Sequence, residues 1–300
     1  MKIVFFGTPD FAIPSLQILH ESEHQIVGVV TAPDKQRGRG RKVSYTPIKK
    51  YALENDLFLL QPEKLNDDDF VDSLKKLNAD LFVIVAFRIL PTRVFTIPPK
   101  GSFNLHGSLL PKYRGAAPIQ WALINGEKET GVTTFFLKEK VDTGNIIAQE
   151  KIKISDDDNL GTLHDKMSEI GARLVLKTVN LIDNNSYVLS EQDNSKATPA
   201  PKITKDTCKI NWEKSAEEIH NLIRGLSPFP GAFFVHNDKQ YKIFKSDIVN
   251  SPQLRPAEIN QTKKELFVGT NNGTIQILEI QPEGRKRMTT EEFLRGYSLV

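Results

Sequence analysis

A short polar motif near the middle of the chain combines an amide donor with a titratable imidazole. Asn104 and His106 are two residues apart in a segment with the pattern of a strand. Side chains two apart on a strand point to the same face, and ligands bind at the carboxyl ends of parallel strands. An amide can stabilise an oxyanion, and an imidazole moves protons near neutral pH. The pair therefore fits an acyl-transfer centre, although an ordinary surface pair has the same spacing.

A carboxylate that could complete such a centre is Asp142, in the turn-like sequence Val141-Asp142-Thr143-Gly144. A carboxylate near His106 would stabilise the imidazolium and fix its tautomer. Asp-Thr-Gly is also ordinary turn chemistry. It matches one half of an aspartic-protease site as well, but a single copy would require a dimer.

Other chemistries have weaker support in the sequence. Ser108 lacks the GxSxG pattern of a serine nucleophile, and Gly7 begins neither a GxGxxG motif nor a P-loop. His164 and His220 lack metal-ligand spacing, so we expect no metal site. Cys208 is the single cysteine, which excludes an internal disulfide and favours the reducing cytoplasm.

Charge is concentrated in one segment of the 300-residue chain, whose net charge is +3. Residues 34–50 contain seven basic residues and one acid, a local charge of +6. Such a segment indicates an anionic partner, with phosphate the usual candidate, or else a solvated surface loop. No apolar stretch approaches the roughly 18 residues of a membrane helix, so we expect no membrane association.

Strand and helix patterns alternate through the first half of the chain. Strands are predicted over residues 2–6, 25–31, 58–61, 80–86 and 102–105, and helices over 10–21, 47–55 and 67–77. Added strands over 132–137 and 145–154 precede a long helix over 159–184. This alternation predicts an α/β fold, with a Rossmann-like domain over residues 1–187 whose sheet is mostly parallel.

The last third of the chain has a different pattern. Residues 188–204 are polar and contain two prolines, which is typical of a linker. Beyond it, a helix over 213–224 precedes short strands over 232–236, 240–245, 265–269 and 274–281, and a final helix spans 289–296. We therefore predict a smaller, OB-like β-barrel domain over residues 205–300.

Taken together, the motifs resemble those of the formyltransferases that use 10-formyltetrahydrofolate. The three most specific motifs span Asn104 to Pro111, Tyr113 to Pro118 and Asp142 to Gly144. Shorter ones are Gly7-Thr8-Pro9-Asp10-Phe11-Ala12, Arg37-Gly38-Arg39-Gly40-Arg41-Lys42, Ile210-Asn211-Trp212, Ser227-Pro228-Phe229-Pro230-Gly231 and Gln281-Pro282-Glu283-Gly284-Arg285-Lys286. The likeness covers nearly the whole chain and is greatest to family members that formylate the methionine of initiator tRNA.

The resemblance implies a role for each matched position. The catalytic residues would be Asn104, His106 and Asp142; the folate-binding residues Ser108, Leu109, Leu110 and Pro111; and the tRNA-binding residues Arg37, Arg39, Arg41 and Lys42. The formyl donor would be 10-formyltetrahydrofolate, the acceptor the α-amino group of initiator methionyl-tRNA, and no metal would take part. The C-terminal barrel would help to hold the tRNA, and we expect a monomer.

One segment departs from the family, and two other functions stay open. The family's Ala-Tyr-Gly-x-Ile-Leu-Pro is here Ala86-Phe87-Arg88-Ile89-Leu90-Pro91, one residue shorter and without the glycine, so pterin contacts do not transfer to it. A formyltransferase for a small amine or an amino sugar nucleotide would share the catalytic trio but would not need the basic segment. A noncatalytic RNA-binding protein would need the basic segment but would leave the trio unexplained.

Overall fold

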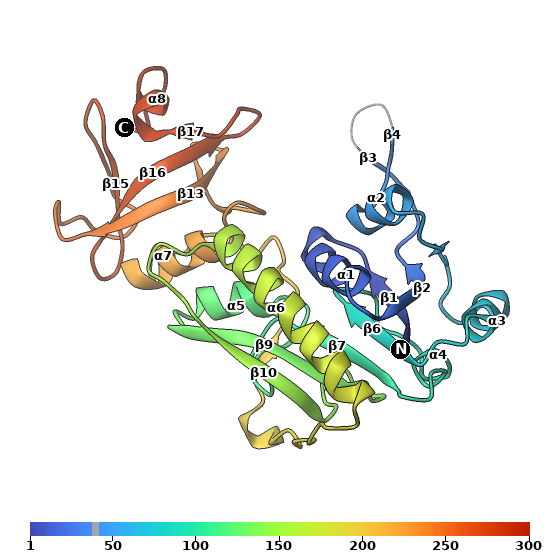
Figure 1. Cartoon of the computed structure of the whole chain (residues 1–300). Coiled ribbons are helices and arrows are strands. Elements are labelled where there is room, and N and C mark those ends of the chain that lie inside the picture. Colours follow the sequence, from blue (N-terminus) through green and yellow to red (C-terminus); the bar gives the residue numbers. More distant parts are fainter. Residues whose placement is uncertain (38–41) are drawn as a thin grey trace. The chain divides into compact units, whose positions relative to one another are not determined.

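The computed structural model describes residues 1–37 and 42–300. The chain forms two compact units, each assembled from three segments. Unit 1 comprises Met1–Gly115, Gly131–Ile152 and His164–Pro199, and unit 2 comprises Ala116–Thr130, Lys153–Leu163 and Ala200–Val300. Each unit is built around its own sheet (Figure 1). In the described part of the chain, no helix combines the length and hydrophobicity needed to cross a bilayer.

A seven-stranded sheet lies at the centre of unit 1, in the order β10-β9-β7-β6-β1-β2-β5. Its strands are β1 (Lys2–Gly7), β2 (Gln25–Val30), β5 (Leu59–Leu60), β6 (Leu81–Val85), β7 (Ser102–His106), β9 (Glu129–Phe136) and β10 (Ile146–Lys153). The strands from β5 to β7 are parallel, and β9 runs antiparallel to β7. The predicted Rossmann-like, mostly parallel sheet is thereby confirmed.

Helices accompany the sheet of unit 1. They are α1 (Ile13–His20), α2 (Pro47–Glu54), α3 (Asp68–Lys76), the short α4 (Thr92–Phe95) and the long α6 (Leu160–Asp183). Among them, α2 and α3 have side-chain N-caps. The Thr46 hydroxyl accepts the Lys49 N–H at 3.0 Å and Pro47 begins the helix, an arrangement that stabilises the first turn of α2. The buried face of α3 packs into a core with Phe6 and Phe82.

The first predicted helix begins later than expected. Residues 10–12 form a 3₁₀ turn, and α1 starts only at Ile13. The reason is Pro14, which has no N–H to donate to the carbonyl of Asp10 as an α-helix would require. The N–H of Ile13 bonds to that carbonyl instead, which gives the tighter turn.

Two short strands in the basic segment were not predicted. The strands β3 (Lys35–Arg37) and β4 (Lys42–Ser44) pair antiparallel, with Lys35 opposite Ser44. Arg37 and Lys42 therefore face each other in backbone register, whereas Arg39 and Arg41 lie outside the described residues. Strands of three residues carry too little periodicity to be recognised in a sequence.

Unit 2 is built on an antiparallel sheet that forms a half-barrel, so the predicted β-rich C-terminal architecture is confirmed. Its strands are β12 (Ala232–His236), β13 (Lys239–Val249), β14 (Ile259–Gln261), β15 (Leu266–Gly269), β16 (Thr274–Pro282) and β17 (Met288–Thr289). A turn at residues 271–273 joins β15 to β16. β14 and β17 were missed, since each has three residues or fewer.

Helices pack onto this second sheet. Unit 2 contains α5 (Pro118–Ile124), α7 (Ala216–Gly225) and α8 (Thr290–Leu294). α5 and α7 approach closely at Gly225, where a Cβ would lie 2.8 Å from Ile124 Cγ1. A side chain at this position would force the two helices apart. The segment of residues 116–130 therefore belongs to the core of unit 2 although it is distant in sequence from residues 200–300.

Candidate active site

The strand β7 carries both residues of the polar motif. It lies between β6 and β9, with Asn104 opposite Ile84 on one side and Phe135 on the other. Asn104 and His106 are two residues apart, so their side chains leave the same face of the sheet. His106, the last residue of the strand, is only 6% exposed, so its imidazole is largely shielded from bulk water.

The hydrogen bond of His106 determines which ring nitrogen can exchange a proton. Nε2 lies 2.8 Å from the carbonyl oxygen of Tyr113. A carbonyl oxygen only accepts, so Nε2 is the donor and carries a proton. In the neutral ring Nδ1 then holds the lone pair, and Asp142 Oδ2 lies 3.9 Å from it. Nδ1 is therefore the nitrogen available for proton exchange.

Asp142 occupies the turn between β9 and β10. Its backbone has a φ of 54°, a left-handed conformation that aspartate tolerates better than most residues. Its Oδ2 accepts a hydrogen bond of 2.9 Å from the backbone N–H of Gly115, and its side chain is 12% exposed. At 3.9 Å from His106 Nδ1, the carboxylate acts on the ring through its charge, because that distance is too long for a hydrogen bond.

The side chain of Asn104 differs from these two because it is not engaged locally. It is half-buried, and within residues 1–37 and 42–300 its amide has no hydrogen-bond partner. A polar amide next to a shielded imidazole can donate to a substrate oxygen. Donors arranged in advance around a developing oxyanion are a large source of rate acceleration.

Together these groups suit transfer of an acyl group to an amine. A carbonyl carbon near Asn104 would have a donor for its oxygen, and Nδ1 of His106 could take a proton from the attacking nitrogen. Among the side chains described, no three or more His, Cys, Asp or Glu residues are arranged as a metal site. The geometry thus places an amide donor, an imidazole with one nitrogen available and a nearby carboxylate in one region of unit 1.

Comparison with known families agrees with this chemistry. A family model described as formyl transferase matches residues 1–179, and a model of the formyl transferase C-terminal domain matches residues 202–298. The chain belongs to the formyl transferase family. This formyl transferase therefore carries the family's C-terminal domain as well as its first domain.

The relatives named methionyl-tRNA formyltransferase match this formyl transferase over nearly its whole length. That of Bacteroides fragilis is 46% identical, with 100% of this chain and 96% of the relative covered. That of Thermodesulfovibrio yellowstonii is 48% identical, with 98% and 95% covered. The solved sugar 3N-formyl transferase WlaRD, in the presence of dTdp and 5-N-formyl-THF, has a TM-score of 0.70 at 25% identity, with 95% and 99% covered.

The predicted folate-binding residues form a tightly held turn after β7. The Ser108 hydroxyl donates to the Lys112 carbonyl at 2.6 Å, and the Leu110 N–H donates to the Thr133 hydroxyl at 3.1 Å. Ser108 and Leu110 are buried, whereas Leu109 and Pro111 are partly exposed. Side-chain contact with a ligand is thus available to Leu109 and Pro111, while Ser108 and Leu110 hold the turn.

The segment that departs from the family has its own anchor, Arg88. The Arg88 Nη1 and Nη2 atoms donate to the carbonyls of Glu63 and Pro62, at 3.0 and 2.7 Å. Burial lowers the pKa of this guanidinium below its usual value, and its Nε is buried without a hydrogen-bond partner in the described chain. Ile89 is 73% exposed. This formyl transferase therefore fixes the shortened segment with a side chain rather than with a glycine turn.

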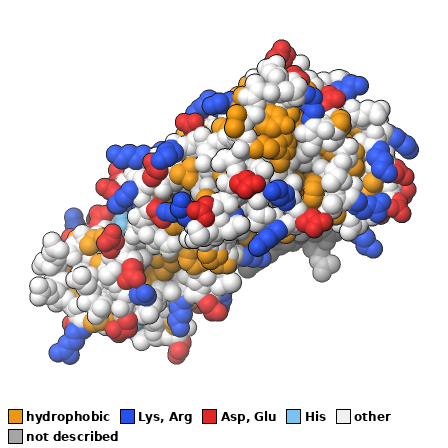
Figure 2. Space-filling model, turned by 90° about the horizontal axis from the view of Figure 1, so that it is seen from below, with side chains coloured by type: hydrophobic (Ala, Val, Ile, Leu, Met, Phe, Trp, Pro, Cys, Tyr) orange, Lys and Arg blue, Asp and Glu red, His pale blue; other side chains and the backbone are white. Residues whose placement is uncertain are grey.

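Within the basic segment of residues 34–50, the charge of Lys49 is balanced by an acid. Lys49 forms an ion pair with Asp34 and lies over the Tyr45 ring, 4.0 Å from its centroid. Hydrogen bonds from Gln61 and Lys49 lower the pKa of Asp34. Elsewhere, basic and acidic side chains are interspersed on the face seen in Figure 2, in keeping with a net charge of only +3.

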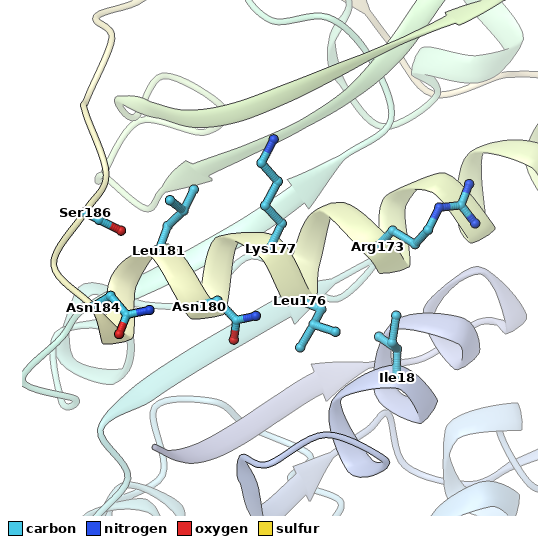
Figure 3. Close-up of a pocket in the computed structure, with 8 residues that line it drawn as sticks. All are labelled: Ile18, Arg173, Leu176, Lys177, Asn180, Leu181, Asn184 and Ser186. Atoms are coloured by element: carbon cyan, nitrogen blue, oxygen red, sulfur yellow. The ribbon is translucent and has the colours of Figure 1, made fainter.

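A groove of about 390 Å³ in unit 1 lies apart from these residues, along α6. Leu176 and Ile18 point toward each other across it (Figure 3). Asn180, another lining residue, bonds to His24 Nε2 at 2.8 Å. Its lining includes no acid, thiol or imidazole.

Sequence reasoning missed three groups that support the site. The Tyr113 carbonyl and the Gly115 N–H hold His106 and Asp142, respectively; both are backbone groups, which a sequence motif does not reveal. The third is Gln192, in the predicted linker, which donates to the Asp142 carbonyl at 3.0 Å. Polar composition predicted an exposed linker there, and no local pattern distinguishes this glutamine.

Proposed function

We propose that this chain transfers the formyl group of 10-formyltetrahydrofolate to the α-amino group of initiator methionyl-tRNA, giving N-formylmethionyl-tRNA for translation initiation. The supporting observation is its 46% identity to the methionyl-tRNA formyltransferase of Bacteroides fragilis over 100% of the chain. We place the protein in the cytoplasm and expect it to act as a monomer.

In the proposed reaction, the methionine nitrogen attacks the formyl carbon. The new C–N bond forms as the carbonyl electrons move to oxygen, where the Asn104 amide and the protonated His106 stabilise the negative charge. His106 becomes protonated in this same step, because Nδ1 takes the proton that the amine loses. Asp142 keeps the imidazolium oriented until it gives that proton to N10 of the folate. The tetrahedral adduct then expels the folate N10, which takes up a proton, so no covalent enzyme intermediate forms.

The remaining site assignments belong to the same proposal. Leu109 and Pro111 contact the folate, with Ser108 and Leu110 shaping the turn that presents them. Arg37, Arg39, Arg41 and Lys42 bind tRNA phosphates, and the residues of the C-terminal domain hold the rest of the tRNA. We retain 1–187, 188–204 and 205–300 as the catalytic domain, the linker and the tRNA-binding domain.

A formyltransferase for small amines or sugar nucleotides is the alternative. It would have the same trio, but identity to the sugar enzyme WlaRD is 25%, against 46% for the relative from Bacteroides fragilis. Activity on initiator methionyl-tRNA, without activity on free methionine or an amino sugar nucleotide, separates the two. A noncatalytic RNA-binding protein would show neither activity.

The first test removes the amide of Asn104. In formylation assays with charged initiator tRNA and 10-formyltetrahydrofolate, we expect Asn104→Ala to lower turnover by about 10²-fold or more, because an oxyanion donor is lost. The affinity for tRNA should change little. Asn66→Ala, at an exposed position, is the matched control and should keep wild-type turnover. Full turnover by Asn104→Ala would show that its amide does not act in catalysis.

The second test concerns the basic segment. Replacing Arg37, Arg39, Arg41 and Lys42 together by glutamine should weaken tRNA binding and reduce its salt dependence, since each lost phosphate contact lowers the log–log slope by about 1. The control replaces four exposed lysines elsewhere, Lys64, Lys75, Lys76 and Lys196, which changes the net charge equally. If both variants show the wild-type slope, the segment does not contact tRNA phosphates.

A further inference from the structure

The side chain of Gln192 bridges the turn that carries Asp142. Its Nε2 donates to the carbonyl oxygens of Asp142, at 3.0 Å, and Gly144, at 2.8 Å. These two carbonyls lie on either side of Thr143, at the tip of the connection between β9 and β10. One amide therefore holds the backbone of the residue whose carboxylate faces His106.

Arg114 fixes the orientation of this amide. Its Nε and Nη2 both donate to Gln192 Oε1, at 3.0 and 2.6 Å. A guanidinium has only donors, so the oxygen of Gln192 must face it and the NH₂ group must face the turn. The charge on Arg114 also strengthens these bonds compared with a neutral donor. The two side chains together form a clamp, Arg114–Gln192, on the turn.

The same segment of the chain supports the imidazole as well. The Thr198 hydroxyl accepts the N–H of Tyr113 at 2.9 Å, and the Thr198 carbonyl accepts the N–H of Arg114 at 2.9 Å. Tyr113 is the residue whose carbonyl accepts from His106 Nε2. Residues 192–198 therefore contact the backbone that positions both members of the His106–Asp142 pair, all within unit 1.

We propose that Gln192, oriented by Arg114, is a positioning residue that sets the distance between the Asp142 carboxylate and Nδ1 of His106. This inference rests on the proposed formyl transfer. Asp142 has a left-handed backbone, with a φ of 54°, in a turn where neighbouring Val141 is 46% exposed. Apart from the clamp, the Gly115 N–H bonds to the carboxylate itself, whereas the Thr143 hydroxyl donates to the Lys140 carbonyl at 2.7 Å.

Loss of the clamp should affect kcat more than KM. A misplacement of about 1 Å at a reacting pair can cost on the order of 10²-fold in rate. Losing the clamp should therefore lower kcat by about 10- to 100-fold. KM for both substrates should stay within about threefold, because Gln192 touches backbone rather than substrate.

The test variant is Gln192→Met, which keeps the size of the side chain but removes all four hydrogen bonds. Gln192→Glu keeps an acceptor for Arg114 and loses both donations to the turn, so it should show the same defect even if the methionine variant folds poorly. The matched control is Glu191→Ala, at the exposed neighbouring position, which should have wild-type kcat.

A double-mutant cycle separates positioning from a general structural role. If Gln192 acts through Asp142, then Gln192→Met should cost less than about threefold in an Asp142→Asn background, since there is no carboxylate left to position. If the two losses multiply instead, Gln192 acts independently of Asp142 and the proposal is wrong. Wild-type kcat in both Gln192 variants would overturn it as well.

A second readout does not depend on activity. The Gly115 N–H is hydrogen-bonded to Asp142, so its hydrogen exchange reports whether the carboxylate is in place. Exchange at Gly115 should be at least about tenfold faster in Gln192→Met than in Glu191→Ala. Unchanged exchange would overturn the clamp. If hydrogen exchange at Gly115 differs between the two variants as expected but the wild-type protein formylates no tRNA, the proposed function is wrong while the positioning by Gln192 stands.

Discussion

Two imidazoles, the buried His106 of the proposed site in unit 1 and the half-buried His220 in unit 2, have different surroundings. Each ring forms one hydrogen bond through one nitrogen: His106 Nε2 to the Tyr113 carbonyl at 2.8 Å, and His220 Nδ1 with the Ser246 hydroxyl at 3.2 Å. The two rings differ in the charge beside them. His106 faces the carboxylate of Asp142, whereas His220 lies near a guanidinium. The charge of that guanidinium affects the ring more than the carboxylate of Asp247 or that of Asp156 does.

The guanidinium in unit 2 belongs to Arg224, which is itself only 7% exposed. Its Nε donates to Asn221 Oδ1 at 2.8 Å, and its Nη1 donates to the carbonyls of Ser155 and Asp158 at 3.4 and 3.3 Å. Burial, and after it the charge of Arg224, lowers the pKa of His220. A nearby cation disfavours protonation, so His220 is kept neutral and takes part in the packing of unit 2.

The contrast shows that burial of an imidazole does not by itself indicate a catalytic site. The proposed role of His106 depends on the polar groups beside the ring and on whether one nitrogen remains available. His106 has a carboxylate opposite Nδ1 and, next but one along β7, an amide without a partner in the described chain. His220 has the guanidinium of Arg224 beside it, and its Nδ1 bonds to the Ser246 hydroxyl.

The largest expected effect is the difference in activity between the two histidines. His106→Asn should lower formylation turnover by about 10²- to 10⁴-fold, the range for loss of a general acid or base. His220→Asn, which serves as the matched control, should change turnover by less than about threefold. The measurement is kcat at saturating concentrations of both substrates, with folding checked by circular dichroism. Comparable losses in the two variants would contradict the contrast.

Part of this contrast could be predicted from the sequence. The period-two spacing placed Asn104 and His106 on one face of a strand, and β7 does carry both. The alternation of strands and helices likewise predicted the sheet, because each buried strand has a long apolar pattern. Very short strands such as β14 and β17 were not predicted, since two or three residues show no measurable periodicity.

Contacts between distant parts of the chain were harder to predict. The proximity of Asp142 to His106 was expected from the family resemblance, not from any local pattern. The clamp by Gln192 was not expected at all, because a polar segment with prolines predicts a solvated linker. Its bonds span 78 residues to Arg114 and 50 to Asp142, and such pairings depend on the tertiary fold. The unequal surroundings of His106 and His220 have the same origin.

The smaller expected effect is a pH dependence of stability caused by His220. Its folded-state pKa lies below the ordinary value of 6.5, so the unfolded chain binds its proton more readily than the folded one. The stability contributed by neutral His220 is complete above pH 6.5 and is lost as the pH falls below it, by no more than about 1.4 kcal/mol per pH unit.

The measurement compares the free energy of unfolding of the wild type and of His220→Gln between pH 7.5 and about 5. Glutamine does not titrate in this range and can still bond to Ser246, so the variant should lose less stability on acidification. The capping carboxylate Glu218 does not interfere, because hydrogen bonds from Ser215 and Lys214 lower its pKa to about 2 and its loss begins only below about pH 4.5. If the free energy of unfolding falls equally with pH in the two proteins, the folded state tolerates a charged His220. The two histidines would then be distinguished only by their effects on turnover.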